Sequence, residues 1–328
     1  MTRDIWVLVE QWRGQVSDVT YEVLALGREL ATATGGSLQA VVLGPGVAGV
    51  PSSLGAADGL LVAEHSSLAE PEPDLYALAL AQVVPERQPE ALLIPQTNAL
   101  MGCGPLLAVR LGLPCINSCR DISLDQGRLV ARCLLYGGKV EAAVAPGRTP
   151  VVLGILPGTR PREQGRVDGT PPSTAVSVDL STTPAVRFRG YTEPPPGDVD
   201  ITRESILVAV GRGIQRQENV ALAEELAAAL GGAVCGSRPV VDQGWLPASR
   251  QVGTSGMIVE PQVYLALGIS GAPEHVEGMK RAKLIIAVNT DPRAPIFGVA
   301  HYGVTADLFD IVPLLIDRVG ASRQKAAS

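Results

Sequence analysis

The sequence predicts two α/β domains, each built on a parallel sheet whose faces are covered by helices. Short apolar segments alternate with segments of helical periodicity in both halves of the chain, a pattern typical of covered parallel sheets. The chain has 328 residues, more than one hydrophobic core usually supports. Proline and glycine are dense between residues 157 and 197, so we predict one domain at 1–196 and a second at 197–328.

The first half begins as alternating strands and helices. Short apolar runs predict strands at 5–9, 38–43, 59–63 and 91–94. Apolar residues at helical spacing predict helices at 19–33, 75–84 and 98–111. Gly35 and Gly36 end the first helix, and Pro85 ends the second. Pro105 either kinks the third helix or marks its true start.

The pattern then changes to consecutive strands. Three short strands, at 129–135, 139–145 and 151–155, follow one another with glycine and proline turns between them. We therefore expect an antiparallel patch at the edge of the first parallel sheet. Residues 176–178 and 186–191 could add further strands to the first domain.

The second half opens with a strand at 206–210, a glycine turn at 211–213 and a helix at 218–230. This is the geometry of Rossmann-like nucleotide-binding domains. The third glycine of the dinucleotide fingerprint is missing, because position 216 is arginine, so the turn alone is a weak indication of a ligand. The remaining predictions are strands at 263–267 and 284–288, an amphipathic helix at 307–319 and a loose tail at 322–328.

Composition argues against several classes of protein. Hydrophobic residues make up 46% of the chain, enough to fill a core, so the chain is not disordered. The net charge of −6 argues against nucleic acid and anionic membranes as partners. The longest weakly polar stretch, 75–84, is about half of the roughly 20 residues that a membrane span needs. The apolar run at 5–9 is too short for a signal peptide, so the sequence predicts a cytoplasmic protein without membrane insertion.

The cysteines are predicted to be free thiols. The chain has 5 of them, an odd number, and most stand among apolar residues, which argues against a disulfide framework. Cys115 and Cys119 have no histidine near them, and their spacing is not typical of zinc ligands. We therefore expect no metal site.

Several short motifs could bind a ligand, although each also fits an ordinary turn. Arg212 stands in the glycine turn, where a guanidinium could bind phosphate. Ser270 can cap a following helix, whose N-terminus could bind an anion. Residues 251–256 place two hydroxyls between glycines, where a flat ring could approach the backbone. The sequence holds no Ser-His-Asp pattern of a known family, no HExxH and no P-loop, so no catalytic residues are predicted.

Taken in order, a series of segments carries a family resemblance. The segments are 210–213, 236–238, 251–256, 268–275, 278–280, 289–297 and 302–309. Together they resemble the FAD domain of the alpha subunit of electron transfer flavoproteins, and residues 7–10 and 136–139 resemble that family's N-terminal domain less specifically. The resemblance implies a heterodimer with a beta subunit and one noncovalent FAD in the second domain. It also implies electron transfer from flavin dehydrogenases to a membrane quinone reductase or another acceptor oxidoreductase.

The resemblance also implies contacts with FAD. Those at the phosphate, the ribitol and the isoalloxazine ring are Arg212, Ser237, Arg238, Val252, Gly253, Thr254 and Ser255. Those at the pyrophosphate, the ring edge and the adenosine are Ser270, Gly271, Ala272, Pro273, Glu274, His275, Asn289, Asp307 and Leu308. Arg238 would lie over the ring, Ser255 would bond N5, and a titratable His275 would face the O2 edge. The two basic groups would stabilise negative charge on the ring and favour an anionic semiquinone.

The sequence departs from the family pattern in two places. Thr254 and Ser255 stand where many relatives have Gln-Thr, which keeps the hydroxyl and loses an amide. His301 stands where many relatives have aspartate.

The alternative function is an electron-bifurcating subunit that oxidises NADH with a second FAD in its partner. A plain NAD-binding domain would leave Arg238, Ser255 and His275 without a shared purpose.

Overall fold

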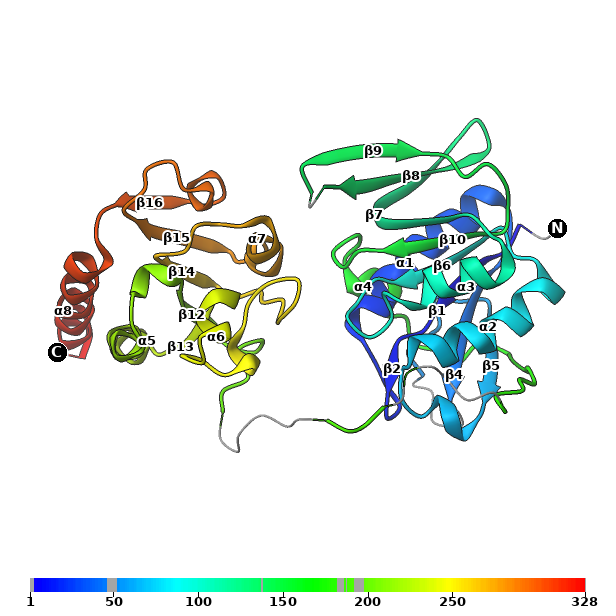
Figure 1. Cartoon of the computed structure of the whole chain (residues 1–328), viewed down its shortest axis with the longest axis horizontal. Helices are drawn as coiled ribbons and strands as arrows, with labels where there is room; N and C mark the ends of the chain where they lie inside the picture. Colours follow the sequence, from blue (N-terminus) through cyan, green and yellow to red (C-terminus); the bar gives the residue numbers. More distant parts are fainter. Residues whose placement is uncertain are drawn as a thin grey trace. The chain divides into compact units, whose positions relative to one another are not determined.

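A computed structural model describes residues 3–45, 52–136, 138–181, 186, 188–191 and 198–327, with side chains described as far as residue 322 (Figure 1). The chain divides into two units, Met1–Gly190 and Tyr191–Ser328. The predicted domain boundary, between residues 196 and 197, falls outside the described residues. Each unit has its own sheet and its own hydrophobic core.

The first unit contains a sheet of nine strands in the order β11-β5-β4-β1-β6-β10-β7-β8-β9. The strands are β1 (Ile5–Leu8), β4 (Leu38–Gly44), β5 (Gly59–Glu64), β6 (Ala91–Pro95), β7 (Cys115–Asp125), β8 (Arg128–Leu135), β9 (Val140–Val144), β10 (Val151–Ile155) and β11 (Ser173–Ala175). Neighbours from β11 to β7 are parallel, whereas β7, β8 and β9 pair in antiparallel fashion. The antiparallel edge predicted from the sequence is therefore confirmed. A small hairpin of β2 (Gln11–Trp12) and β3 (Gln15–Val16) follows β1.

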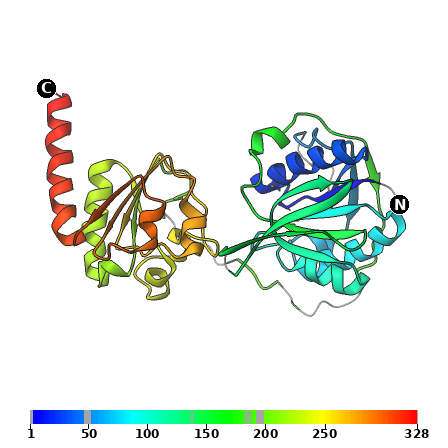
Figure 2. The ribbon, with the colours of Figure 1, turned by 90° about the horizontal axis from the view of Figure 1, so that it is seen from above.

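Helices cover both faces of this sheet (Figure 2). The helices are α1 (Asp18–Thr34), α2 (Pro73–Arg87), α3 (Cys103–Leu111) and the short α4 (Arg162–Gly165). Because side chains alternate along a strand, Ile5 and Val7 of β1 pack in the cluster that contains α1, whereas Trp6 and Leu8 pack in the cluster that contains α2 and α3. The first predicted helix ends as expected, with Gly35 in the left-handed conformation.

Several predictions for the first unit need correction. β10 lies between β6 and β7 in the parallel part of the sheet, not in the antiparallel patch, and its complete burial suits a central parallel strand. β7 was not predicted, because polar residues interrupt its apolar pattern. The helix α2 continues through the exposed Pro85 to Arg87, since a proline in the last turn removes only one hydrogen bond.

Two further boundaries also differ from the prediction. α3 begins at Cys103 rather than at residue 98, which confirms the alternative that Pro105 lies at the true start of the helix. The last strand of the unit is β11, which ends at Ala175. The described residues of the two predicted strands, 176–178 and 186–191, lie outside strands.

The second unit contains five parallel strands in the order β13-β12-β14-β15-β16. They are β12 (Ile206–Val210), β13 (Ala233–Gly236), β14 (Val263–Leu267), β15 (Leu284–Asn289) and β16 (Tyr302–Thr305). The order of connection reverses between β12 and β14, which makes that crevice the switch point of an open α/β sheet. The predicted Rossmann-like architecture is confirmed.

Helices and loops enclose this second sheet. Its helices are α5 (Val220–Leu230), α6 (Arg238–Asp242), α7 (Pro273–Met279) and α8 (Leu308–Ala327). Residues of α5, α6 and α8 share one core with Val208 and Val210, whereas Met279 of α7 shares another with Leu207 and Ala209. α8 continues through most of the segment predicted as a loose tail, because that segment consists mainly of good helix formers.

All 5 cysteines are free, as predicted, and four of them are buried. Among the described residues, no group of histidine, cysteine and acidic side chains could hold a metal ion. Within the same residues, no helix is both long and apolar enough to cross a membrane.

The turns that follow β12 and β14 touch through their backbones. The amide of Gly211 donates to the carbonyl of Leu267 at 2.9 Å, and the amide of Gly213 donates to the carbonyl of Gly268 at 3.1 Å. A Cβ atom on Gly268 would lie 2.6 Å from Cα of Gly213, and Gly268 has a φ of +62°. Glycine is therefore required here for both conformation and space.

This contact predicts that Gly268→Ala lowers the free energy of unfolding by about 3 kcal/mol or more, from left-handed strain and steric overlap together. Gly244→Ala is the matched control, because Gly244 has a φ of +72° but nothing within 4 Å of its Cβ position. It should lose only about 1 kcal/mol. Urea denaturation measures both losses, and equal values would contradict a close approach of the two turns.

Candidate functional site

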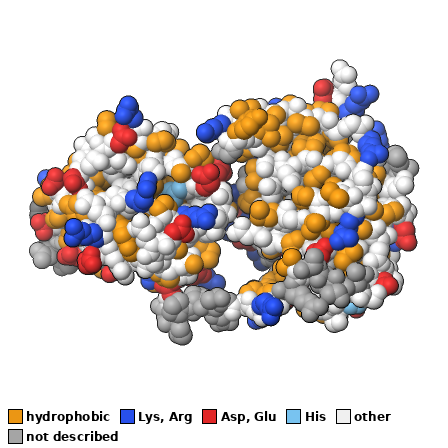
Figure 3. All heavy atoms as spheres, in the orientation of Figure 1, with side chains coloured by type: hydrophobic (Ala, Val, Ile, Leu, Met, Phe, Trp, Pro, Cys, Tyr) orange, Lys and Arg blue, Asp and Glu red, His pale blue; other side chains and the backbone are white. Residues whose placement is uncertain are grey.

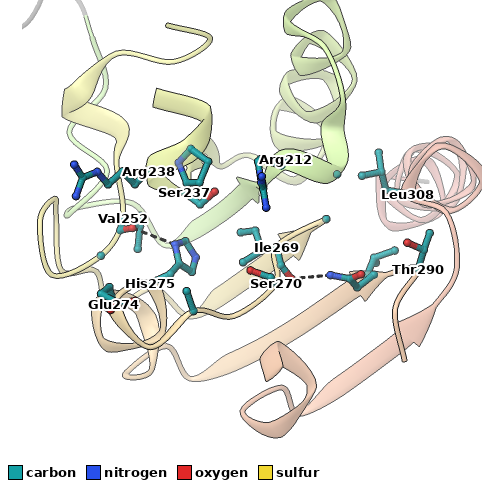
Figure 4. Close-up of a pocket in the computed structure, with 18 of the residues that line it drawn as sticks. Arg212, Ser237, Arg238, Val252, Ile269, Ser270, Glu274, His275, Thr290 and Leu308 are labelled. Carbon is teal, nitrogen blue, oxygen red and sulfur yellow. Dashed lines mark hydrogen bonds between the residues drawn. The ribbon is translucent and has the colours of Figure 1, made fainter. Parts of the chain in front are cut away.

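A cavity of about 720 Å³ lies along the carboxyl ends of the strands in the second unit (Figure 4). Its walls come from the segments that follow β12, β13, β14, β15 and β16, so it crosses the switch point between β12 and β14. Ligands of open α/β sheets bind at this position. The volume lies within the usual range for small-molecule sites.

The structure brings most of the predicted site residues together. Those that line the cavity are Arg212, Ser237, Arg238, Val252, Gly253, Thr254, Ser255, Ser270, Ala272, Glu274, His275, Asn289, Asp307 and Leu308. Gly271 and Pro273 do not line it. Gly271 packs beneath, where a Cβ atom would lie 2.3 Å from the backbone nitrogen of Ile296, and Pro273 is the first residue of α7.

The cavity presents hydrogen-bond donors that have no partner among the residues that the structure describes. The side chains of Arg212, Ser237, Ser270 and Thr290 line it and make no hydrogen bond or ion pair with any described residue. The sequence suggests Ser270 as a cap of the following helix, but the N-cap of α7 is Ala272. A guanidinium and several hydroxyls are suitable donors for phosphate oxygens and ligand carbonyls.

A closed loop positions Thr254 and Ser255. The amide of Met257 donates to the carbonyl of Gln251 at 2.7 Å, and the amide of Gly253 donates to the carbonyl of Met257 at 3.1 Å. The side-chain amide of the buried Gln251 donates to Oγ of Ser255 at 3.0 Å. The tip of the loop is tied to α7, since the amide of Thr254 donates to the carbonyl of Glu274 at 2.9 Å. Both hydroxyl residues are thus held at one end of the cavity.

His275 is held by two hydrogen bonds within the protein. Its Nδ1 lies 3.1 Å from the carbonyl oxygen of Val252, and its Nε2 lies 2.9 Å from the hydroxyl of Tyr264. The side chain is only 6% exposed. Burial lowers the pKa of His275 to about 4, although the Val252 carbonyl opposes this shift. The imidazole is therefore neutral at physiological pH, which differs from the titratable group expected from the sequence.

Asn289 lines the cavity and also makes hydrogen bonds within the protein. Its side-chain amide donates to the carbonyl of Ile269 at 2.8 Å, and its side-chain oxygen accepts from the amide of Asp291 at 2.9 Å. It thereby joins the segments that follow β14 and β15. His301 lies away from the cavity, because its Nδ1 accepts from the amide of Ile285 near the amino end of β15.

Sequence reasoning missed several lining residues. They are Gly211, Gly213, Gln215, Pro239, Gly268, Ile269, Val288, Thr290 and Ala306. Most could have been found, since they stand at or just after the carboxyl end of a predicted parallel strand. Gln215 carries no such signal, and its φ of 70° is visible only in the structure.

Comparison with known proteins agrees with this geometry. Residues 200–280 match the family described as electron transfer flavoprotein FAD-binding domain, and residues 5–181 match the electron transfer flavoprotein domain. The chain belongs to the electron transfer flavoprotein alpha-subunit family. FAD is accordingly the cofactor of the second unit.

Three relatives cover almost the whole chain. The acryloyl-CoA reductase electron transfer subunit beta of Anaerotignum propionicum is 36% identical, over 97% of this chain and 95% of the relative. Protein FixB of Clostridium saccharobutylicum is 35% identical, over 96% and 95%. An electron transfer flavoprotein subunit alpha, from Thermoanaerobacterium thermosaccharolyticum, is 32% identical over 97% and 98%.

The cavity of this flavoprotein subunit fits an extended dinucleotide. It reaches from the end of β13 to the end of β16, across four spacings of the five-stranded sheet, a span of about 19 Å at the usual strand separation. The unpartnered donors Arg212, Ser237, Ser270 and Thr290 are spread along it. They suit the phosphates and hydroxyls of FAD.

The contacts of Asn289 predict that Asn289→Ala lowers the free energy of unfolding by about 1–2 kcal/mol, because two hydrogen bonds are lost. The neighbouring Thr290→Val should change it by less than about 0.5 kcal/mol, since that hydroxyl has no described partner. Chemical denaturation of the FAD-free protein measures both. If Asn289→Ala were as stable as Thr290→Val, its role in joining the two segments would be wrong.

Proposed function

We propose that this chain is the alpha subunit of a heterodimeric electron transfer flavoprotein that carries electrons from flavin dehydrogenases to a membrane quinone reductase or another acceptor. The observation that supports it most directly is a cavity lined by unpartnered donors within a FAD-binding domain. Bound FAD would supply one-electron chemistry. No catalytic residue is proposed, because the chain's own side chains bind and orient the cofactor rather than transform a substrate.

The donors support one orientation of the cofactor. We place the isoalloxazine ring at the end of the cavity formed by Arg238 and residues 252–255, and the adenosine at the end formed by Asn289, Asp307 and Leu308. Arg212 and Ser270 lie near the switch point, between these ends, and would bind the pyrophosphate. Ser255 would donate to the ring from its closed loop.

The first unit would contact the beta subunit. One relative is named as an electron transfer subunit beta and another as a subunit alpha, so the names of the relatives support a complex of two chains. Figure 3 shows hydrophobic side chains gathered on the visible face of the first unit. Met101, just before α3, and Leu106 and Val109 on the helix are exposed apolar residues of this unit, which suits contact with a partner.

Flavin content tests the proposed function. The chain is purified with its partner subunit, its flavin is counted, and reduction is followed stepwise by absorbance. One FAD per complex that accepts electrons in two separate steps supports a carrier. Two FAD per complex together with oxidation of NADH would support the bifurcating alternative. A complex that stays colourless after reconstitution with FAD would contradict both.

Arg238 gives a second test, because its charge should stabilise the reduced flavin. The side chain lies in the wall of the cavity, is 68% exposed and forms an ion pair with Asp242 at 3.4 Å. Arg238→Ala should lower the midpoint potential of FAD by the equivalent of about 1 kcal/mol, a modest effect because solvent screens the charge. Arg203→Ala is the control, since Arg203 is 86% exposed, pairs with Asp200 and does not line the cavity. A redox titration that is the same for all three proteins would show that Arg238 does not face the ring.

A further inference from the structure

The wall behind the cavity contains a buried polar pair that the cofactor contacts do not explain. Tyr264 of β14 is fully buried, and its hydroxyl lies 2.9 Å from Nε2 of His275 in the first turn of α7. On the other side of the imidazole, Nδ1 lies 3.1 Å from the carbonyl oxygen of Val252, as the dashed line in Figure 4 shows. Both ring nitrogens are therefore used by the protein.

The chemistry of these partners fixes where the protons lie. A backbone carbonyl can only accept a hydrogen bond, so Nδ1 of His275 must carry a proton. A neutral imidazole has one N–H, which leaves Nε2 with a lone pair that accepts from the Tyr264 hydroxyl. Burial raises the pKa of Tyr264 well above its usual value, so this phenol keeps the proton that it donates.

The groups around His275 favour the neutral imidazole. Behind the pair, Cys235 lies close to Tyr264, and burial raises the pKa of its thiol to about 12, so it adds no charge there. Toward the cavity, the charged residues near this end are Glu274, which precedes His275 in α7, and Arg238 in α6. Neither contributes to the lowered pKa of His275, whose causes are burial and then the opposing Val252 carbonyl. No described carboxylate forms an ion pair with His275, so a positive charge on this buried ring would not be compensated by an acidic side chain.

We infer that Tyr264 is a positioning residue that holds His275 as a neutral imidazole with its proton on Nδ1, so that His275 offers bound FAD neither an N–H donor nor a positive charge. This inference rests on the proposed function, because it concerns the environment of the flavin. It assigns the positive charge in the cavity wall to Arg212 and Arg238. It also assigns a role in cofactor tuning to Tyr264, which does not line the cavity.

Nuclear magnetic resonance of ¹⁵N-labelled histidine tests the inference directly. The chain has only 3 histidines, and the signal of His275 is assigned by its loss in His275→Gln. The nitrogen shifts of the full chain, with its partner and with or without FAD, report which nitrogen carries the proton between pH 5 and pH 8. Tyr264→Phe removes only the hydroxyl. Tyr76→Phe is the matched control, since Tyr76 is a buried tyrosine of the first unit whose hydroxyl donates to the carbonyl of Leu43.

The expected result in the unaltered protein is a neutral His275 with its proton on Nδ1 throughout this range. In Tyr264→Phe the ratio of protonated to neutral His275 at pH 5 should rise about two- to tenfold, the equivalent of one lost hydrogen bond. Tyr76→Phe should leave the ratio unchanged. A proton on Nε2, a titration near the ordinary pKa of histidine, or no response to Tyr264→Phe would overturn the inference. The spectra without FAD test the inference even if the chain does not bind flavin. The spectra of the unaltered protein test it even if Tyr264→Phe does not fold.

Discussion

The backbone contact between the turns after β12 and β14 is the constraint on which the cavity depends. These strands are neighbours in the sheet, and their connections leave it on opposite sides, so a crevice opens between them. Gly211, Gly213 and Gly268 let the two turns approach closely enough for direct hydrogen bonds. The floor of the crevice is therefore peptide backbone, and the side chains of the surrounding segments are left to form its walls.

The polar side chains in and behind the walls form two sets. One set makes hydrogen bonds within the protein, and the other has no hydrogen-bond partner among the described residues. Asn289, His275 and Gln251 make side-chain hydrogen bonds that hold loops or ring orientation, although two of them also line the cavity. Arg212, Ser270 and Thr290 make none with described residues. The shape of the site is thus fixed by one set of polar side chains, and the affinity for FAD would come largely from the other.

The sequence predicted most of this site because the relevant signals are local. An apolar strand followed by a glycine turn, as at 206–213, identifies both an element and the edge of the sheet where ligands bind. The family resemblance then named most of the lining residues. The order of strands in the first sheet was less accessible, because β10 pairs with β6 and β7, which are distant in sequence. The partners of His275 were inaccessible for the same reason, since Tyr264 and Val252 reach it from other segments.

Burial affects the reactivity of Cys235, which lies in the strand layer beside the cofactor cavity. It belongs to β13, one of the strands whose end borders the cavity, and burial raises the pKa of its thiol to about 12. Only a thiolate attacks peroxides or electrophilic rings at an appreciable rate. A thiol held neutral in this way would react only slowly with peroxide released when a reduced flavin meets oxygen. The electron carrier can keep a cysteine within its core without losing it to side reactions.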